Sequence, residues 1–177
     1  AHDYFDSLVS AYPRNAEITY LYSKASYYKA VGLEEQEKIQ EAFQYYLKSL
    51  ESLDNIRLNK KITSDKLYDE TIHFKALIYT RLGDLLYWYD VYDAAIECIT
   101  NANELFILEN NRNALSRNNI ILAVIYGLNL NHDKALYHLS IADSIFKINN
   151  IDVLLKNDIE RIKASVMYNI GYKEEAF

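Results

Sequence analysis

Residues 91–109 read VYDAAIECITNANELFILE, and this stretch decides the fold class. Its apolar side chains recur three and four residues apart, which is the spacing of one helix face; they are Ala95, Cys98, Ile99, Ala102, Leu105 and Phe106. Forty residues later the same positions hold Ala135, His138, Leu139, Ala142, Ile145 and Phe146. Five of those six are apolar again, in the same order of size. The pattern predicts a repeated helical unit with a period near forty residues.

The residues that precede each stripe repeat as well. The run Leu82-Gly83 returns as Leu122-Ala123, and a third copy has Lys163-Ala164. In each copy a small residue stands twelve positions before a second one; the pairs are Gly83 with Ala95, Ala123 with Ala135, and Ala164 with Ala176. Small side chains are needed where two helix backbones approach closely. The unit is therefore predicted to be a helix, a tight turn and an antiparallel helix.

These residues resemble the tetratricopeptide repeat (TPR) family. The central copy carries Leu82-Gly83, Tyr92-Asp93-Ala94-Ala95-Ile96 and Ala102, similar to the family's leucine-glycine, tyrosine-acidic-x-alanine and alanine signature. The resemblance implies an all-α fold, a right-handed superhelical solenoid of antiparallel helix pairs with about nine helices. TPR units usually have about 34 residues, so the longer period implies longer helices or loops. Asp90 stands where a turn glycine is common.

The repeat positions divide the chain into parts of a single TPR-like solenoid over 1–177. The expected parts are a half repeat at 1–13, a repeat at 15–53, a connecting loop at 54–66, repeats at 67–109 and 113–148, and a truncated repeat at 151–177. In the first full repeat, Ala25 is matched with Ala42, and the stretched spacing predicts an insertion around Gly32 to Glu37. Ser64 or Asp65 is expected to cap the helix that follows the loop.

Solenoids normally need a polar capping repeat at each end. The half repeats at both ends of the chain lead us to expect a fragment of a longer protein, with possible self-association through the cut repeats.

The composition limits the classes of partner. The 177 residues carry a formal net charge of -6, which opposes the electrostatic attraction of nucleic acids and of anionic membranes. The longest nearly apolar run, 120–128, is far shorter than the roughly 20 residues of a membrane span. We therefore expect neither nucleic-acid binding nor membrane contact by this chain.

No set of residues predicts catalysis. His132 and His138 are six apart, whereas a helical metal pair needs a spacing of four. His138 replaces Cys98 in the apolar stripe, so both are expected to be packed interface residues, and Cys98 to be an inert thiol. The Glu34-Glu35 pair beside a turn is interpreted as solvated charge. We expect no enzyme activity, no cofactor and no metal.

The family resemblance implies a partner-binding groove lined by the first helix of each repeat. Its expected residues are Thr80, Asp84, Tyr87, Trp88, Arg117, Arg161, Ser165 and Tyr168, together with Ile120 and Val124. Asp84 would repel the C-terminal carboxylate that chaperone-binding TPRs clamp, so a protein or peptide segment with apolar anchors is the expected ligand. Trp88 is either a packing cap or an anchor for the partner. Most of the 17 tyrosines are expected to fill the interior. The alternative is that some of them line the groove.

The leading functional expectation is a protein- or peptide-binding interaction module. The Leu-Gly-Asp and Tyr-x-x-Ala-Ile motifs resemble those in the sensor regions of Gram-negative bacterial TPR regulators. That resemblance implies a periplasmic or membrane-tethered, extracytoplasmic part of a larger regulator. The alternatives are a cytoplasmic regulator that binds a signalling peptide and a structural assembly scaffold.

Overall fold

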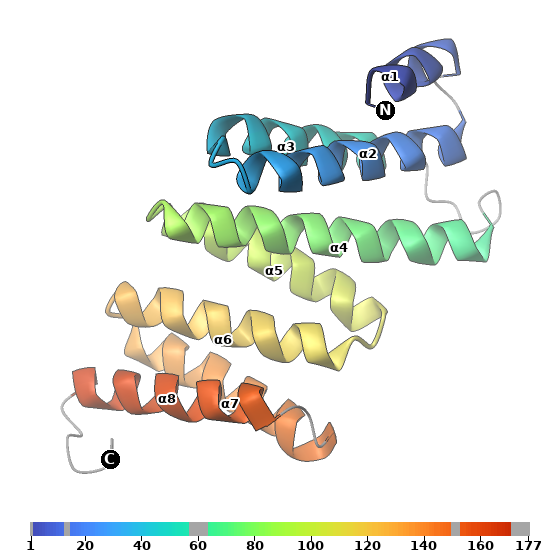
Figure 1. The fold of residues 1–177 in the computed structure, drawn as a ribbon. Coiled ribbons are helices and arrows are strands. Elements are labelled where there is room, and N and C mark those ends of the chain that lie inside the picture. The colour runs from blue at the N-terminus through green and yellow to red at the C-terminus, as the bar shows by residue number, and fades with distance from the viewer. Residues whose placement is uncertain (1, 13–14, 57–63, 150–152, 171–177) are drawn as a thin grey trace. The chain divides into compact units, whose positions relative to one another are not determined.

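The computed structural model describes residues 2–12, 15–56, 64–149 and 153–170, and these residues are almost entirely helical (Figure 1). The eight helices are α1 (His2–Ala11), α2 (Ala16–Glu34), α3 (Ile39–Asp54), α4 (Asp65–Trp88), α5 (Tyr92–Leu108), α6 (Arg112–Leu128), α7 (His132–Asn149) and α8 (Val153–Ile170). The expected all-α class is confirmed, with helices packed in adjacent pairs. The expected ninth helix falls on 171–177, outside the described residues.

The chain forms two compact units that divide within α4, between Leu85 and Leu86. In the first unit α2 packs along α3, and α1 packs against α2. In the second unit α6 packs along α7, α5 packs against α6, and α8 contacts both α6 and α7.

The same turn joins consecutive helices at four described places. In each turn, a residue in the left-handed region follows the helix that ends there. These residues are Glu37, Asp90, Asn110 and Leu130, with φ of 60°, 59°, 53° and 56°. The next N–H then donates to a carbonyl five residues back, as from Val91 to Leu86 at 2.9 Å and from Asn131 to Tyr126 at 2.8 Å. This is the Schellman arrangement, which usually places glycine at the left-handed position. None of these four residues is glycine, so the residue type does not mark the left-handed positions in the sequence.

The predicted insertion around Gly32 to Glu37 is wrong. α2 continues to Glu34, and the chain then enters the same turn as elsewhere. Measured from the left-handed Glu37, the residue equivalent to Ala123 is Ala30 and not Ala25. Ala30 and Ala42 are both completely buried, so the twelve-residue spacing of small residues holds in the first unit as well.

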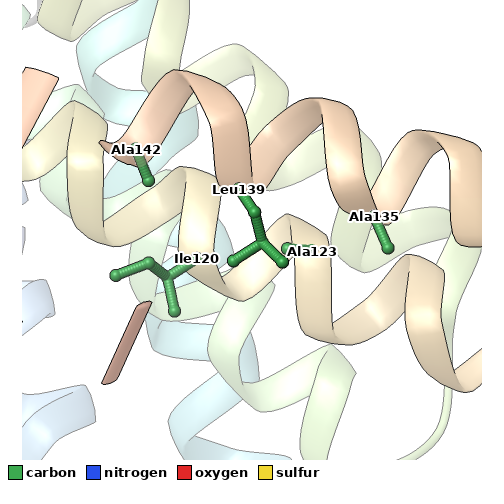
Figure 2. Packing of buried hydrophobic residues seen from close by; sticks show 5 residues of the cluster. All are labelled: Ile120, Ala123, Ala135, Leu139 and Ala142. Atoms are coloured by element: carbon green, nitrogen blue, oxygen red, sulfur yellow. The ribbon is translucent and has the colours of Figure 1, made fainter. Parts of the chain in front are cut away.

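The small residues of the second unit lie where the stripe predicts. Ala123 of α6 and Ala135 of α7 have no exposed surface, and they share one cluster with Leu139, Ala142 and Ile120. Figure 2 shows Leu139 of α7 directed toward Ile120 and Ala123 of α6. The predicted register between these two helices is therefore confirmed.

Serine hydroxyls tie the paired helices at equivalent positions in both units. Ser23 and Ser49 each donate to the other's carbonyl, at 2.9 and 2.8 Å, between α2 and α3. Ser116 donates to the carbonyl of Ala142, at 3.3 Å, between α6 and α7. All four residues are buried. Because these hydroxyls reach carbonyls of the opposite helix, each pair of backbones must lie close together.

Asparagine and serine side chains cap several helices. Asn15, Asn111 and Asn131 each accept a hydrogen bond from the amide three residues on, and Ser64 accepts one from Leu67 at 3.3 Å. Of the two residues considered for the cap of α4, Ser64 is the one seen. α5 has no side-chain cap, because Val91 occupies that position.

We expect Val91→Asn to raise the free energy of unfolding by about 1 kcal/mol, the usual contribution of an N-cap. The backbone is suitable, since Val91 has φ −91° and ψ 66°, and the capping Asn111 has −82° and 78°. Urea unfolding followed by far-UV circular dichroism measures the change. The matched control is Asn111→Ala, which should lose a similar amount. Equal stability of Val91→Asn and the native chain would contradict the capping argument.

Candidate functional site

The predicted groove residues belong to both units. Thr80 and Asp84 lie in the first unit, and the other six, Tyr87, Trp88, Arg117, Arg161, Ser165 and Tyr168, lie in the second. Tyr87 and Trp88 are in ring contact, with centroids 5.6 Å apart. The common groove stays a prediction.

Two of the sequence expectations are settled by burial. Ile120 is only 8% exposed and belongs to the α6–α7 core cluster, so its expected place in a groove is wrong. Trp88 is 75% exposed, so it is not a packing cap. Its indole is exposed to solvent, and its role as an anchor for a partner stays a prediction.

A charged cluster in the first unit was not found from the sequence. The Tyr46 hydroxyl, fully buried, donates to Glu34 Oε2 at 2.8 Å. The interpretation as solvated charge therefore holds for the exposed Glu35 and only in part for Glu34, which is half-buried and hydrogen-bonded. Arg81 of α4 interacts with Glu34 and with the hydroxyl groups of Tyr46 and Tyr27. These residues are far apart in sequence, and only the packing of the first unit brings them together.

Asp84 lies beside this cluster. Burial raises the pKa of its carboxyl from 3.8 to about 6; Glu34 raises it further, and Arg81 opposes the change. We therefore expect an ionised Asp84 to weaken the fold, because the surroundings do not replace the solvation that its charge loses.

Aromatic rings join α2 to α4 in the first unit. The ring of Tyr27 lies 5.0 Å from that of Phe74 and 5.6 Å from that of Tyr46, in edge-on contacts. The ammonium group of Lys24 lies 5.4 Å from the Tyr20 ring and 5.9 Å from the Phe74 ring. Tyrosine suits these positions because its ring packs while its hydroxyl reaches a charged group.

The expectation that most tyrosines fill the interior is only partly met. Three described tyrosines, Tyr20, Tyr22 and Tyr46, are buried. Six are exposed and the rest are half-buried: the exposed ones are Tyr4, Tyr12, Tyr28, Tyr89, Tyr137 and Tyr168.

His138 and Cys98 are packed residues, as expected. His138 Nδ1 lies 2.8 Å from Asn119 Oδ1, and the imidazole stacks on the Tyr126 ring at 5.4 Å. Burial lowers the pKa of His138, and the Lys134 charge lowers it further. Burial also raises the pKa of Cys98 to about 11, with a contribution from Glu97, so the reactive thiolate is disfavoured at neutral pH. Across the described ranges no cluster of histidine, cysteine and acidic side chains could hold a metal ion.

Exposed apolar side chains gather at one end of the second unit. They belong to the α4–α5 turn and the α6–α7 turn, which lie at the same end of their helices (Figure 1). We call this surface the turn edge; it consists of Trp88, Tyr89, Val91, Leu128 and Leu130, which are 75%, 59%, 46%, 53% and 76% exposed. Aromatic residues of this kind are enriched where proteins bind one another.

Two residues of the turn edge are poor choices for the stability of the fold. Leu130 is a large side chain in the left-handed region, where asparagine or glycine is favoured. Val91 occupies a helix N-cap and provides no capping group. Both side chains are exposed, so neither gains stability from burial. Local choices that cost stability without improving the packing are typical of functional surfaces.

The chain matches no protein-family model and no curated protein sequence. In the part of the chain that is described, no helix combines the length and the apolar character needed to cross a membrane.

Proposed function

We propose that this chain is a protein- or peptide-binding module of the TPR-like solenoid type, and that the turn edge contacts the partner. The exposed indole of Trp88 carries the proposal, and four further exposed apolar or aromatic side chains stand in the two turns at the same end of the second unit. Exposed aromatic side chains, tryptophan and tyrosine above all, are enriched at sites where proteins bind one another. Two further observations support the repeat character, namely the identical turns and the equivalent serine hydrogen bonds of the two units.

The resemblance extends the proposal to the sensing or scaffold part of a larger bacterial regulator outside the cytoplasm. The coding sequence that follows Phe177 tests this extension. An apolar membrane span followed by a DNA-binding helix pair would support it, and a sequence with neither would contradict it.

Selection of phage-displayed random peptides on the immobilised chain tests the binding function. We expect enriched peptides that share apolar residues, and we expect Trp88→Ala/Leu130→Asn to weaken their binding by more than about tenfold, as for a hot-spot anchor. Asparagine tolerates the left-handed conformation of residue 130, so this variant should fold. Fluorescence anisotropy with the enriched peptides gives the dissociation constants, and far-UV circular dichroism checks the helical content.

The matched control is Ile107→Ser/Leu108→Ser. These side chains are 63% and 70% exposed at the end of α5, away from the turn edge. The control should bind as the native chain does. Failure to enrich any peptide would argue against a binding module. Binding that survives the Trp88 variant but is lost in Arg117→Ala/Arg161→Ala would place the partner in the predicted groove instead.

A further inference from the structure

Acidic side chains flank the turn edge. Asp90 and Asp93 lie beside Trp88 and Val91 in the chain, and Asp133 follows Leu130; all three aspartates are exposed. Glu97, also exposed, lies one turn further along α5. Two basic residues stand next to these two turns, His132 and Lys134 at the start of α7, and the ammonium group of Lys134 lies 5.0 Å from the Tyr126 ring.

The fold itself accounts for the placement of two of these acids. Asp93 and Asp133 stand in the first turns of α5 and α7, where a negative charge stabilises a helix. An aspartate therefore stands beside an exposed apolar turn in each of the two hairpins α4–α5 and α6–α7. A ligand that contacts one of these turns meets a carboxylate next to it, even though the carboxylate also stabilises the helix.

We propose that the turn edge binds a cationic segment of a partner protein, with apolar side chains against Trp88 and Leu130 and lysine or arginine side chains near Asp90, Asp93 and Asp133. This inference rests on the proposed function and adds the chemistry of the partner to it. Complementary charge at the rim of an apolar contact steers association and excludes partners of the wrong sign.

A second copy of the chain and a membrane surface both fit the negative charge beside the turn edge less well. A second copy of this chain carries the same net charge of -6 and would bring acidic rims together in a symmetric contact. A membrane surface suits exposed tryptophan, tyrosine and leucine, but the leaflets that recruit proteins by charge are anionic. The carboxylates of the turn edge oppose such a surface.

Two synthetic peptides test the proposal. Both carry the same leucine and phenylalanine anchors; one has flanking lysines and the other has flanking glutamates. Fluorescence anisotropy should show that the lysine peptide binds at least about tenfold more tightly than the glutamate peptide at low salt. This preference should fall as sodium chloride screens the charges. Asp90→Asn/Asp93→Asn/Asp133→Asn should remove the preference and retain anchor-dependent binding. Trp88→Ala/Leu130→Asn should weaken both peptides, and Ile107→Ser/Leu108→Ser should weaken neither.

The outcomes separate this inference from the proposed function. Equal binding of the two peptides, still dependent on Trp88, would overturn the cationic partner and leave the binding module standing. No binding of either peptide, together with a failed phage selection, would overturn both. Trp88-dependent binding to phosphatidylcholine vesicles without peptide binding would replace the protein partner by a membrane. A dimer in sedimentation equilibrium that is lost in Trp88→Ala would replace it by a second copy.

Discussion

Replacing Ala123 by leucine is expected to lower the free energy of unfolding by about 3 kcal/mol, the upper part of the range for overpacked cores. Ala123 and Ala135 are completely buried in one cluster with Leu139, at the place where α6 and α7 pack against each other (Figure 2). A larger side chain at residue 123 requires either strained rotamers or separation of the two helices. Urea unfolding followed by far-UV circular dichroism measures the loss.

Ser140→Leu is the matched control for this prediction, because it adds a leucine to the exposed face of α7. It should change the stability by less than about 0.5 kcal/mol, as surface substitutions usually do. If Ala123→Leu unfolds at the same urea concentration as Ser140→Leu, then the helices do not approach closely at residue 123, and the register of the repeat is wrong.

The sequence predicts α5 and α7 well because their apolar residues form one clean stripe. Each of the two helices buries a regular row that includes an alanine near its start, Ala95 or Ala135. Every position of such a row is read from spacing alone, without knowledge of the partner helix.

α2 shows where the same reading fails. Small residues recur along it at Ala25, Ser26 and Ala30, so several registers satisfy the pattern. The left-handed Glu37 fixes the true register, but glutamate is not a residue that indicates a left-handed turn. The sequence pattern therefore favours Ala25 together with an insertion, whereas Ala30 is the residue that occupies the position of Ala123.

The surface was less predictable than the helices, because exposure depends on how many neighbours a helix has. α6 contacts α5, α7 and α8, so it buries a wider face than one stripe, and Ile120 is buried although it stands beside the exposed Arg117. The hydrogen bond between Tyr46 and Glu34 joins α3 to α2, and the sequence pattern does not fix the register of these two helices. The interaction of Arg81 with Glu34 and Tyr46 depends on a third helix, α4, and no pattern along the chain marks it.

Asp84→Asn is expected to stabilise the protein at neutral pH. Burial, with Glu34 adding to it, raises the pKa of Asp84 from 3.8 to about 6 in the folded state. A raised carboxyl pKa means that the stability is fully present below about pH 4, where Asp84 is protonated in both states, and is lost as the pH rises toward about 6. Each pKa unit corresponds to about 1.4 kcal/mol. A cost of about 2 kcal/mol above pH 6 is expected, since the side chain keeps part of its contact with solvent.

The variant should therefore match the native chain at about pH 4 and exceed its free energy of unfolding by about 2 kcal/mol at about pH 7.5. Urea unfolding curves across this range measure the difference. Asp69→Asn, at an exposed site on the same helix, should leave the curves unchanged at every pH. If Asp84→Asn raises the free energy of unfolding by the same amount at pH 4 and pH 7.5, the gain comes from helix propensity or packing and not from the raised pKa of Asp84. A loss at pH 7.5 would show that the attraction of Arg81 outweighs the burial of the carboxylate, so that the ionised Asp84 supports the first unit.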